Sequence, residues 1–591
     1  MSALIIAFLL ATRIVVHDES QLPRFSYPVT TAPSELLTSD DKTFMPFAKA
    51  VEADIDRTLT DYDIQDAATL SGLLRTKLAY QLLTHDNDGA RASIARLREL
   101  ASKPDLKLLT GRLALAKLDA DAHASSFAAV DRDATNALPW SVVADTIKEE
   151  YAGERIETKD AIVGFVKHDL DPIAQKSGTL DGPSARELVR ARSTLIDTLP
   201  LAAMDAPILH AYIAQHDVPE PDIWAARDVT VTPAQVKAPV VIGIWDSGVD
   251  PSDYRGFMYV DSRGRHGIAF ADDGATSTSY LYPMPAAVRA RYPKYAKYFQ
   301  GFADLESAID SPQARAVIAY QRSLSADGAA QLARDMEYVG EYAHGSHVAG
   351  IALRGNAGGR ILVARFDDDL PDLHFPPTMA WVKRMAANFA LTAAYFRANH
   401  VRVVNISWSD TASEFEDWIA RTDKITSAQA RKQKAQRLFA VWRAAIEHVI
   451  ATNPNTLFVA AAGNDDNNAS FAQDVPSSLR YPNLLTVGAT NQAGEATNFT
   501  SYGPTVAVYA DGYHVASKLP GGYVVKWSGT SMAAPNVANL AGKLFALDPS
   551  LTAVEARALI IKGATRSADG KRMLIDPKRT VHLLTALRTS S

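Results

Sequence analysis

Five mostly apolar runs, separated by longer segments with helical periodicity, define the second half of this 591-residue sequence. Each run has the length of a strand, and such runs are typical of strands that are buried on both faces of a parallel sheet. They are VVIGIW from 240, ILVARF from 361, VRVVNISW from 401, TLFVAAAGN from 456 and LLTVGAT from 484. The segments 379–399 and 426–451 are predicted helices. The alternation predicts an α/β fold with a doubly wound, mostly parallel sheet flanked by helices, whose functional groups lie beyond the carboxyl ends of the strands.

The first half of the sequence has a different pattern. Apolar residues recur at helical spacing through residues 40–216, which predicts a mostly α-helical N-terminal domain. Residues 217–238 are rich in proline and lose this period, so we interpret them as a linker. The α/β domain is then predicted to span 239–588, with a helical insertion at about 285–335.

Composition excludes several classes of protein. The formal net charge is −6, so the chain has no global basic field for a nucleic acid partner. The sequence contains no cysteine, which excludes disulfides, thiolate zinc sites and a cysteine nucleophile. The apolar stretch at 3–11 is far shorter than the ~20 residues of a membrane-spanning helix, so no membrane span is expected.

Residues 1–16 form a signal-like apolar segment. The apolar centre has a suitable size for an export signal, but no Lys or Arg precedes it and no A-x-A cleavage site follows it. A buried strand or helix is the alternative. The pattern slightly favours export, periplasmic or secreted, over the cytoplasm and leaves the compartment unknown.

Three polar segments carry the candidate chemistry. Asp246 directly follows the first apolar run; taken alone, such an aspartate is more often a turn or cap residue. The run HGSHVAG holds His344 and His347 and leads into a predicted helix, without the H-E-x-x-H pattern of a zinc site. Ser531 is predicted to head another helix, with Pro535 in its first turn. A serine at this position has its own N–H and the positive end of the helix dipole beside the reacting centre.

The segments WDSGVD, HGSHVAG, AAAGN and GTSMAAP, in this order, resemble those of the subtilisin-like serine proteases, the subtilases. The order Asp, His, Ser matches that family and differs from the chymotrypsin and α/β-hydrolase orders. The resemblance implies a subtilisin-like sheet and a triad in which Ser531 is the nucleophile, His344 the base and Asp246 the residue that holds the imidazole. It also implies that Asn464 donates its amide to the oxyanion, and that the second histidine of HGSHVAG packs within its helix.

The resemblance further implies how a polypeptide substrate binds. An extended peptide adds as a strand, and its P1 side chain, that of the residue whose carbonyl is attacked, enters a slot between two strand ends. The matching positions are Ser407, Trp408, Ser409, Ala461, Ala462 and Gly463. Ser409 stands where the family usually has glycine, so a narrower and more polar slot is expected. The insertion at 285–335 is interpreted as a lid or flank of this cleft, or equally as a surface elaboration.

No cofactor is required by this chemistry. Calcium commonly stabilises the family as a structural ion, and Asp367, Asp368, Asp369 and Asp372 offer oxygen atoms. An aspartate run without defined ligand spacing is more often a solvated turn, so the ion cannot be assigned from the sequence and no metal ligand is predicted.

The leading hypothesis is a serine endopeptidase that hydrolyses peptide bonds through an acyl-enzyme. The N-terminal helical domain is then either a prosegment removed by self-cleavage or a retained domain that binds the catalytic domain or another protein. One alternative is a non-catalytic binding protein on a protease fold. Another is a transpeptidase or cyclase that uses the same acyl-enzyme.

Overall fold

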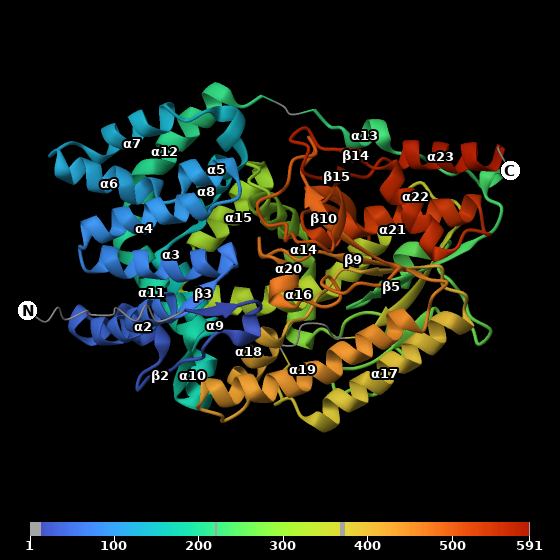
Figure 1. Ribbon diagram of the computed structural model, residues 1–591, viewed down its shortest axis with the longest axis horizontal. Helices are drawn as coiled ribbons and strands as arrows, with labels where there is room; N and C mark the ends of the chain where they lie inside the picture. The colour runs from blue at the N-terminus through green and yellow to red at the C-terminus, as the bar shows by residue number, and fades with distance from the viewer. Residues whose placement is uncertain (1–12, 219–220, 367–372, 590–591) are drawn as a thin grey trace, which may run out of the picture.

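The computed structural model describes residues 13–218, 221–366 and 373–589. A helical N-terminal region lies on one side of the molecule and an α/β region on the other (Figure 1). The four motifs that resemble those of the subtilases all lie in the α/β region. This arrangement confirms the predicted fold class.

The N-terminal region is built mainly from helices that begin at capping side chains. Asp40, Asp66 and Asp86 each accept a hydrogen bond from the backbone N–H three residues further on, which satisfies one free donor of the first turn. The helices are α1 (Pro33–Thr38), α2 (Asp41–Asp61), α3 (Ala67–Leu83), α4 (Asn87–Leu100), α5 (Pro104–Leu109), α6 (Arg112–Ala122), α7 (Phe127–Asn136), α8 (Trp140–Ile156), α9 (Lys159–Asp169), α10 (Asp171–Ser177), α11 (Gly182–Ser193) and α12 (Leu199–His216).

Two small sheets complete this region. Strand β1 (Ile14–Val16) pairs in parallel with β3 (Tyr62–Ile64), and β2 (Ser26–Pro28) pairs with β4 (Thr179–Asp181). Val16 is fully buried. Residues 1–12, most of the signal-like segment, lie outside the described residues.

The α/β region contains a nine-stranded sheet with the order β14-β15-β11-β10-β9-β8-β5-β7-β6. Its pairs are parallel except β14 with β15. The strands are β5 (Val240–Asp246), β6 (Gly267–Ala269), β7 (Gly359–Arg365), β8 (Val403–Ile406), β9 (Leu457–Ala461), β10 (Leu484–Thr490), β11 (Val506–Asp511), β14 (Thr565–Arg566) and β15 (Met573–Leu574). The five apolar runs thus become β5, β7, β8, β9 and β10, as predicted.

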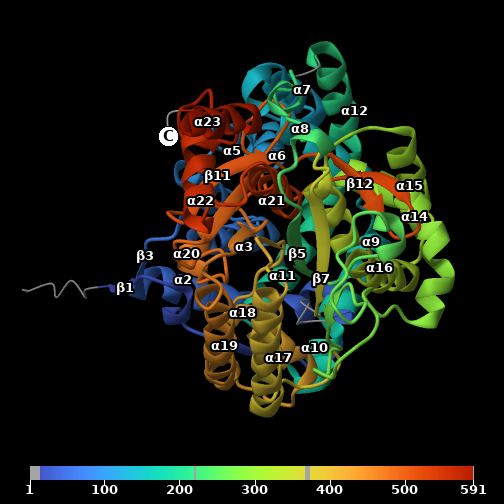
Figure 2. The ribbon, with the colours of Figure 1, turned by 90° about the vertical axis from the view of Figure 1, so that its right-hand side faces the viewer.

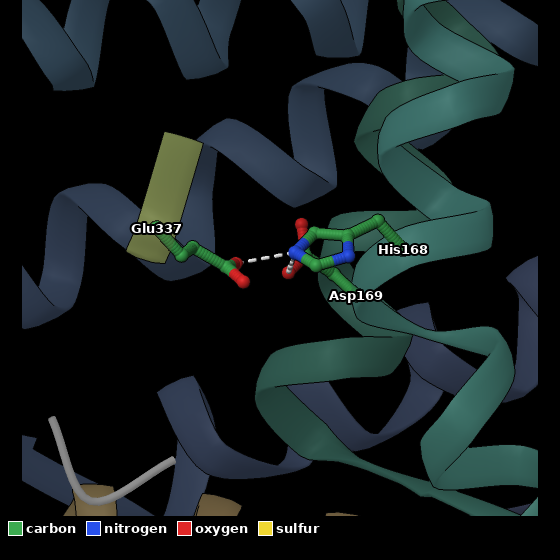
Figure 3. Close-up of side chains that lie close together, drawn as sticks. All are labelled: His168, Asp169 and Glu337. Atoms are coloured by element: carbon green, nitrogen blue, oxygen red, sulfur yellow. Dashed lines mark hydrogen bonds and ion pairs between the residues drawn. The ribbon is translucent and has the colours of Figure 1, made fainter. Parts of the chain in front are cut away.

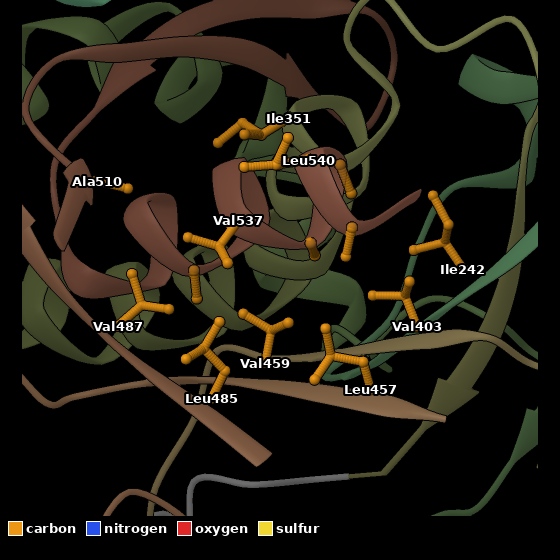
Figure 4. Close-up of a cluster of buried hydrophobic side chains, with 14 of the residues drawn as sticks. Ile242, Ile351, Val403, Leu457, Val459, Leu485, Val487, Ala510, Val537 and Leu540 are labelled. Atoms are coloured by element: carbon orange, nitrogen blue, oxygen red, sulfur yellow. The ribbon is translucent and has the colours of Figure 1, made fainter. Parts of the chain in front are cut away.

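Helices cover both faces of this sheet (Figure 2). One face packs against α16 and α21, where Ile351, Val537 and Leu540 meet strand residues such as Ile242 and Val459 (Figure 4). The other face packs against α17, α18 and α19 in a core rich in aromatic rings. The helices of this region are α13 (Trp224–Arg227), α14 (Ala286–Glu306), α15 (Pro312–Arg322), α16 (Ala326–Leu353), α17 (Met379–Ala398), α18 (Ala412–Thr422), α19 (Ala428–Ala451), α20 (Ala469–Ala472), α21 (Thr530–Leu547), α22 (Ala553–Gly563) and α23 (Pro577–Thr589).

The sheet reverses its winding at β5. This strand pairs with β7 on one side and with β8 on the other, and in open α/β sheets such a switch point forms a crevice beyond the strand ends. Asp246 is the last residue of β5. The topology therefore puts this carboxylate where a doubly wound fold usually binds its ligand.

The insertion between β6 and β7 is helical, comprising α14, α15 and the first half of α16. Its core is shared with a hairpin of β12 (Val515–Leu519) and β13 (Tyr523–Trp527), so the insertion flanks the α/β region rather than extending freely into solvent. Tyr292 of α14 donates a hydrogen bond to Pro520 O at the turn of that hairpin (2.8 Å).

The N-terminal region is docked on the α/β region through polar contacts. Arg24 makes a bidentate pair with Glu416 of α18, at 2.8 and 2.9 Å, and Lys103 pairs with Asp466 at 2.7 Å. Helices α9 and α16 also pack together. Within the described ranges, none of the helices combines the length and apolar character needed to cross a bilayer.

Candidate active site

Asp246 and His344 form the centre of the site. Asp246 is fully buried, and its Oδ1 accepts hydrogen bonds from His344 Nδ1 at 2.8 Å and from the backbone N–H of Ser247 at 2.9 Å. Because a carboxylate only accepts hydrogen bonds, Nδ1 of the neutral imidazole carries the proton. Nε2 is thereby left as the basic atom.

A glycine allows this contact. Gly345 lies on α16 beside His344, and a Cβ at this position would clash with the carbonyl oxygen of Gly248 and lie 2.8 Å from Asp246 Oδ1. Helix α16 can therefore come this close to the end of β5 only because residue 345 is glycine and has no Cβ.

The two histidines of the motif lie in different environments. Burial opposes protonation of His344, but the charge and hydrogen bond of Asp246 outweigh it, so the pKa of His344 is raised above its usual value near 6.5. Its side chain keeps 16% exposure. His347 is fully buried against Val525 O (3.2 Å), and burial lowers its pKa to about 3. His347 therefore belongs to the core and stays neutral.

The helix around these histidines differs from the sequence prediction. HGSHVAG was expected to lead into a helix, but α16 already begins at Ala326, so His344 lies within the helix. The ring of Trp527, on β13, meets the His344 ring edge to face at 5.7 Å, and Phe299 of α14 packs on the same indole at 4.8 Å. The insertion thus supports the imidazole through Trp527.

Ser531 is the second residue of α21, as predicted for a serine that heads a helix. Its hydroxyl donates to the carbonyl oxygen of Ser407 at 3.0 Å, and the Ser407 hydroxyl donates to the carbonyl oxygen of Ser531 at 2.9 Å. Asn405 Nδ2 donates in turn to Ser407 Oγ at 2.8 Å. This reciprocal pair joins the end of β8 to the first turn of α21.

The prediction for Pro535 was wrong. Pro535 lies in the second turn of α21, at the position whose N–H would normally bond to Ser531 O. Since proline has no N–H, this carbonyl is left open and accepts the Ser407 hydroxyl instead. The proline makes the link between Ser407 and Ser531 possible.

Asn464 follows β9 and faces the same first turn. Its Oδ1 accepts hydrogen bonds from Thr530 N and Thr530 Oγ1, both at 2.9 Å, which orients the amide. A Cβ on Gly529 would lie 3.6 Å from Ser531 N and 3.8 Å from Asn464 Nδ2. Both nitrogen donors therefore lie near one point beside Ser531, which Met532 Sδ also approaches to 3.5 Å.

The structure brings Asp246 together with His344, and Ser531 together with Asn464. In the described part of the chain, the hydroxyl of Ser531 bonds to Ser407 and makes no hydrogen bond to His344. Such contacts are often long or differently aligned in a free enzyme and tighten when substrate binds.

The predicted substrate residues lie at the ends of β8 and β9. The indole of Trp408 is buried, donates to Trp245 O at 2.7 Å and packs in the aromatic core, so its backbone alone can face a peptide. Ala461 and Ala462 are also buried, and Gly463 adopts a positive φ of 103°. Ser409 remains partly exposed.

Sequence reasoning missed a carboxylate behind this slot. Asp474 is 3% exposed, and a Cβ on Gly463 would lie 3.3 Å from its Oδ2. It lies outside the four motifs and gave no local signal. Asp474 is brought here by the backbone pairing of Asp410 with Val475, a long-range contact that no sequence pattern indicates.

A second polar cluster lies away from the site, between α9 and α16 (Figure 3). His168 bonds to Glu337 through Nε2, and Asp169 Oδ1 lies 4.0 Å from the same nitrogen. Arg421 pairs with Asp169 at 3.3 Å, so a cation of the protein already balances this carboxylate. We interpret the cluster as part of the contact between the two regions. The aspartates at 367–369 and 372, considered for calcium, lie outside the described residues.

The sequence profile of the "Subtilase family" matches residues 237–575, more than half of the chain. The chain belongs to the subtilase family. Among curated relatives of this subtilase, a "Cell wall-associated protease" of Bacillus subtilis (strain 168) is 40% identical over 110 residues, 19% of this chain and 12% of that protein. A "Subtilisin" of Bacillus pumilus is 35% identical over 115 residues, 20% of this chain and 42% of that protein.

Two further comparisons cover a larger share of this chain. The "Subtilisin-like serine protease Pen ch 13" of Penicillium rubens is 31% identical over 172 residues, 28% of this chain and 42% of that protein. A solved structure, "Crystal structure of a cold adapted subtilisin-like serine proteinase", aligns with 59% of this chain and 93% of its own, at 16% identity and a TM-score of 0.32. The aligned segments span less than half the length of the curated relatives named here.

Replacing Gly345 by alanine is expected to separate His344 from Asp246. The new Cβ pushes α16 from β5, and misplacement of a catalytic group by about 1 Å costs on the order of 100-fold in kcat/KM. Peptide hydrolysis and thermal unfolding should be measured together. Gly340→Ala is the matched control. Gly340 lies on the same helix, and a Cβ there would have no neighbouring atom within 4 Å. Equal activity of the two variants would contradict the close-approach argument.

Titration of the imidazoles by NMR tests the electrostatics of the pair. We expect His344 to titrate above its usual pKa and Asp246→Asn to lower that value, because burial then acts without the opposing carboxylate. His347, with a pKa of about 3, should show no transition between pH 5 and 9 and serves as the internal control. A His344 pKa that is unchanged by Asp246→Asn would refute the assignment.

Proposed function

We propose that this subtilase is a serine endopeptidase that cleaves polypeptides through an acyl-enzyme on Ser531. The observation that carries the proposal is the hydrogen bond between His344 and Asp246 at the switch point of the sheet, next to the strand end at Ser407 to which the start of α21 is hydrogen-bonded. Family membership supports the same chemistry in general terms.

In the first step, Ser531 Oγ attacks the carbonyl carbon of the scissile peptide while His344 Nε2 takes the hydroxyl proton. The hydroxyl must leave its bond to Ser407 O to do so. Asp246 holds the Nδ1–H tautomer and stabilises the imidazolium that forms. The same carboxylate explains why a largely buried imidazole can accept a proton at all.

The negative oxygen of the tetrahedral intermediate is assigned to the point between Ser531 N and Asn464 Nδ2. Both donors are held before substrate arrives, one by the helix and the other by Thr530, so little reorganisation is needed. The positive end of the α21 dipole adds to this field.

In the second step, the C–N bond breaks and His344 gives its proton to the leaving amine. Water then attacks the acyl-enzyme, His344 takes a proton from it, and Ser531 recovers its hydrogen when the acid leaves. An amine in place of water would give a transpeptidase or cyclase. Mass spectrometry of the products separates these outcomes.

The helical N-terminal region is proposed to act as a docked domain of the peptidase. Its Lys103 pairs with Asp466, two residues after Asn464, and its Arg24 pairs with Glu416. Removing the region would leave both carboxylates without these partners. A retained domain is therefore favoured over a prosegment that is lost by self-cleavage.

A fluorophosphonate probe is expected to label Ser531, because His344 makes this hydroxyl nucleophilic. Ser531→Ala should abolish both labelling and casein hydrolysis, and intact-mass and peptide-mass measurements locate the label. Ser407→Ala, which removes a neighbouring hydroxyl, should keep the label at position 531. Labelling that persists in Ser531→Ala would defeat the proposal and favour a binding protein on a protease fold.

Asn464→Ala is expected to lower kcat by about 10²- to 10³-fold, the usual effect of losing one oxyanion donor. KM should stay within a few-fold, because the donor acts mainly in the transition state. Steady-state kinetics on a peptide amide measure the split. A loss confined to KM would contradict the assignment of Asn464 to the oxyanion.

A further inference from the structure

The loop that carries Asn464 is hydrogen-bonded to a second loop of the α/β region. We call residues 463–468, which follow β9, the oxyanion loop, and residues 497–502, between β10 and β11, the support loop. Two backbone hydrogen bonds of 2.9 Å join the loops on either side of Asn464, from Asp466 N to Phe499 O and from Ser501 N to Gly463 O. The position of Asn464 therefore depends on where the support loop lies.

The oxyanion loop contains a residue in an uncommon backbone conformation. Asp466 has a φ of 47°, in the left-handed region that residues other than glycine seldom adopt. Such a conformation persists only where the surrounding structure holds it. Asp466 lies two residues after Asn464, so relaxation of its backbone would move the oxyanion amide.

A lysine of the N-terminal region contacts both loops. Lys103 directly precedes α5, and its Nζ lies 2.7 Å from Asp466 Oδ1 in the oxyanion loop. The same ammonium donates to two carbonyl oxygens of the support loop, those of Asn498 at 2.5 Å and Thr497 at 3.3 Å. Burial raises the pKa of Asp466, and the charges of Lys103 and Arg75 oppose this shift. Lys103 thus compensates a partly buried carboxylate and joins the two loops beside it.

Helix α8 holds the support loop from the same N-terminal region. Asn498 Nδ2 donates to Thr146 Oγ1 at 3.0 Å and to Glu149 Oε2 at 2.7 Å. The Thr146 hydroxyl donates in turn to Asp105 of α5 at 2.6 Å. Because this bond fixes α5 to α8, Lys103 extends from the same support that holds Asn498.

We propose that Lys103 is a positioning residue of the peptidase, through which the N-terminal region holds the oxyanion amide of Asn464 in place. The proposal rests on the proposed function and gives the helical region a part in catalysis. Oxyanion donors are effective when they are held before the charge develops. Thr530 orients the amide of Asn464, whereas Lys103 holds the loop that carries this residue.

Lys103→Met is the central test, because it keeps the length of the side chain and removes its charge and its donors. We expect kcat on a peptide amide to fall by about 10-fold, less than for loss of the Asn464 amide itself, and KM to stay within a few-fold. A peptide boronic acid, which forms an anionic tetrahedral adduct on Ser531, should bind more weakly by a similar factor. A folded Lys103→Met protein with unchanged kcat would overturn the inference.

A double variant separates positioning from a general loss of stability. If Lys103 acts through Asn464, adding Lys103→Met to Asn464→Ala should lower kcat by less than about two-fold, because the donor that the lysine positions is already gone. Independent effects would instead multiply. A full 10-fold loss in the Asn464→Ala background would contradict the proposal.

Arg24→Met is the matched control for docking of the N-terminal region. Arg24 also pairs with the α/β region, and its side chain is 10% exposed against 11% for Lys103. Its partner Glu416 lies on α18 and not on the oxyanion loop, so kcat should stay within about two-fold of the wild type, as for an ion pair remote from the reacting atoms. Equal losses of kcat in the two variants would assign the effect to docking and refute a specific role of Lys103.

Asn498→Ala is a second variant in case Lys103→Met does not fold. It removes the hydrogen bonds of the support loop to Thr146 and Glu149 and is expected to lower kcat several-fold without a change in KM. If Asn464→Ala lowers kcat but neither Lys103→Met nor Asn498→Ala does, the inference fails and the proposed function stands. If Ser531 is not labelled and no peptide is cleaved, both fail.

Discussion

The site depends on one close approach, that of helix α16 to the carboxyl end of β5. His344 and Asp246 are far apart in the sequence, and their 2.8 Å hydrogen bond forms because Gly345 has no Cβ to meet Gly248 O. Parallel strands bring Asp246 to the edge of the sheet, but the topology alone does not set the distance to the helix. The helical insertion also supports the imidazole, because Trp527 contacts both the His344 ring and Phe299 of α14.

Ser531 is held in place by a second arrangement, which depends on the proline within helix α21. Proline in the second turn of α21 costs a backbone hydrogen bond and would normally destabilise a helix. Here the freed carbonyl of Ser531 accepts the Ser407 hydroxyl, and Ser407 is itself held by Asn405. The lost helical bond is thus replaced by one that ties α21 to β8. The first turn, which carries Ser531, is consequently fixed relative to the sheet.

The parts that could be predicted from the sequence are those encoded locally. Apolar runs predicted β5 and β7 to β10, and short motifs predicted which polar residues follow the strands. Two local interpretations failed for tertiary reasons. The glycine and serine beside His344 suggest a helix start, yet the insertion packs on the hairpin and continues α16 back to Ala326. Pro535 resembles a first-turn residue, but its role depends on Ser407, a contact that sequence spacing does not encode.

Asp474 shows the same limit, and its environment differs from that of two other buried acids of the chain. Asp335 is bound by Arg291 at 2.7 and 2.8 Å, and in the N-terminal region Arg112 pairs with Asp131 at 2.6 Å. The fold thus places a guanidinium beside these buried carboxylates, as their desolvation demands. Asp474 is instead surrounded by hydroxyls and further acids within the described residues. Other buried carboxylates accept hydrogen bonds from neutral donors, as Asp410 does from Trp442 Nε1 at 2.8 Å and Asp105 from Thr146 Oγ1 at 2.6 Å. Asp474 belongs to this second group, and because it lies behind Gly463 it is part of the polar packing that holds the segment leading to Asn464.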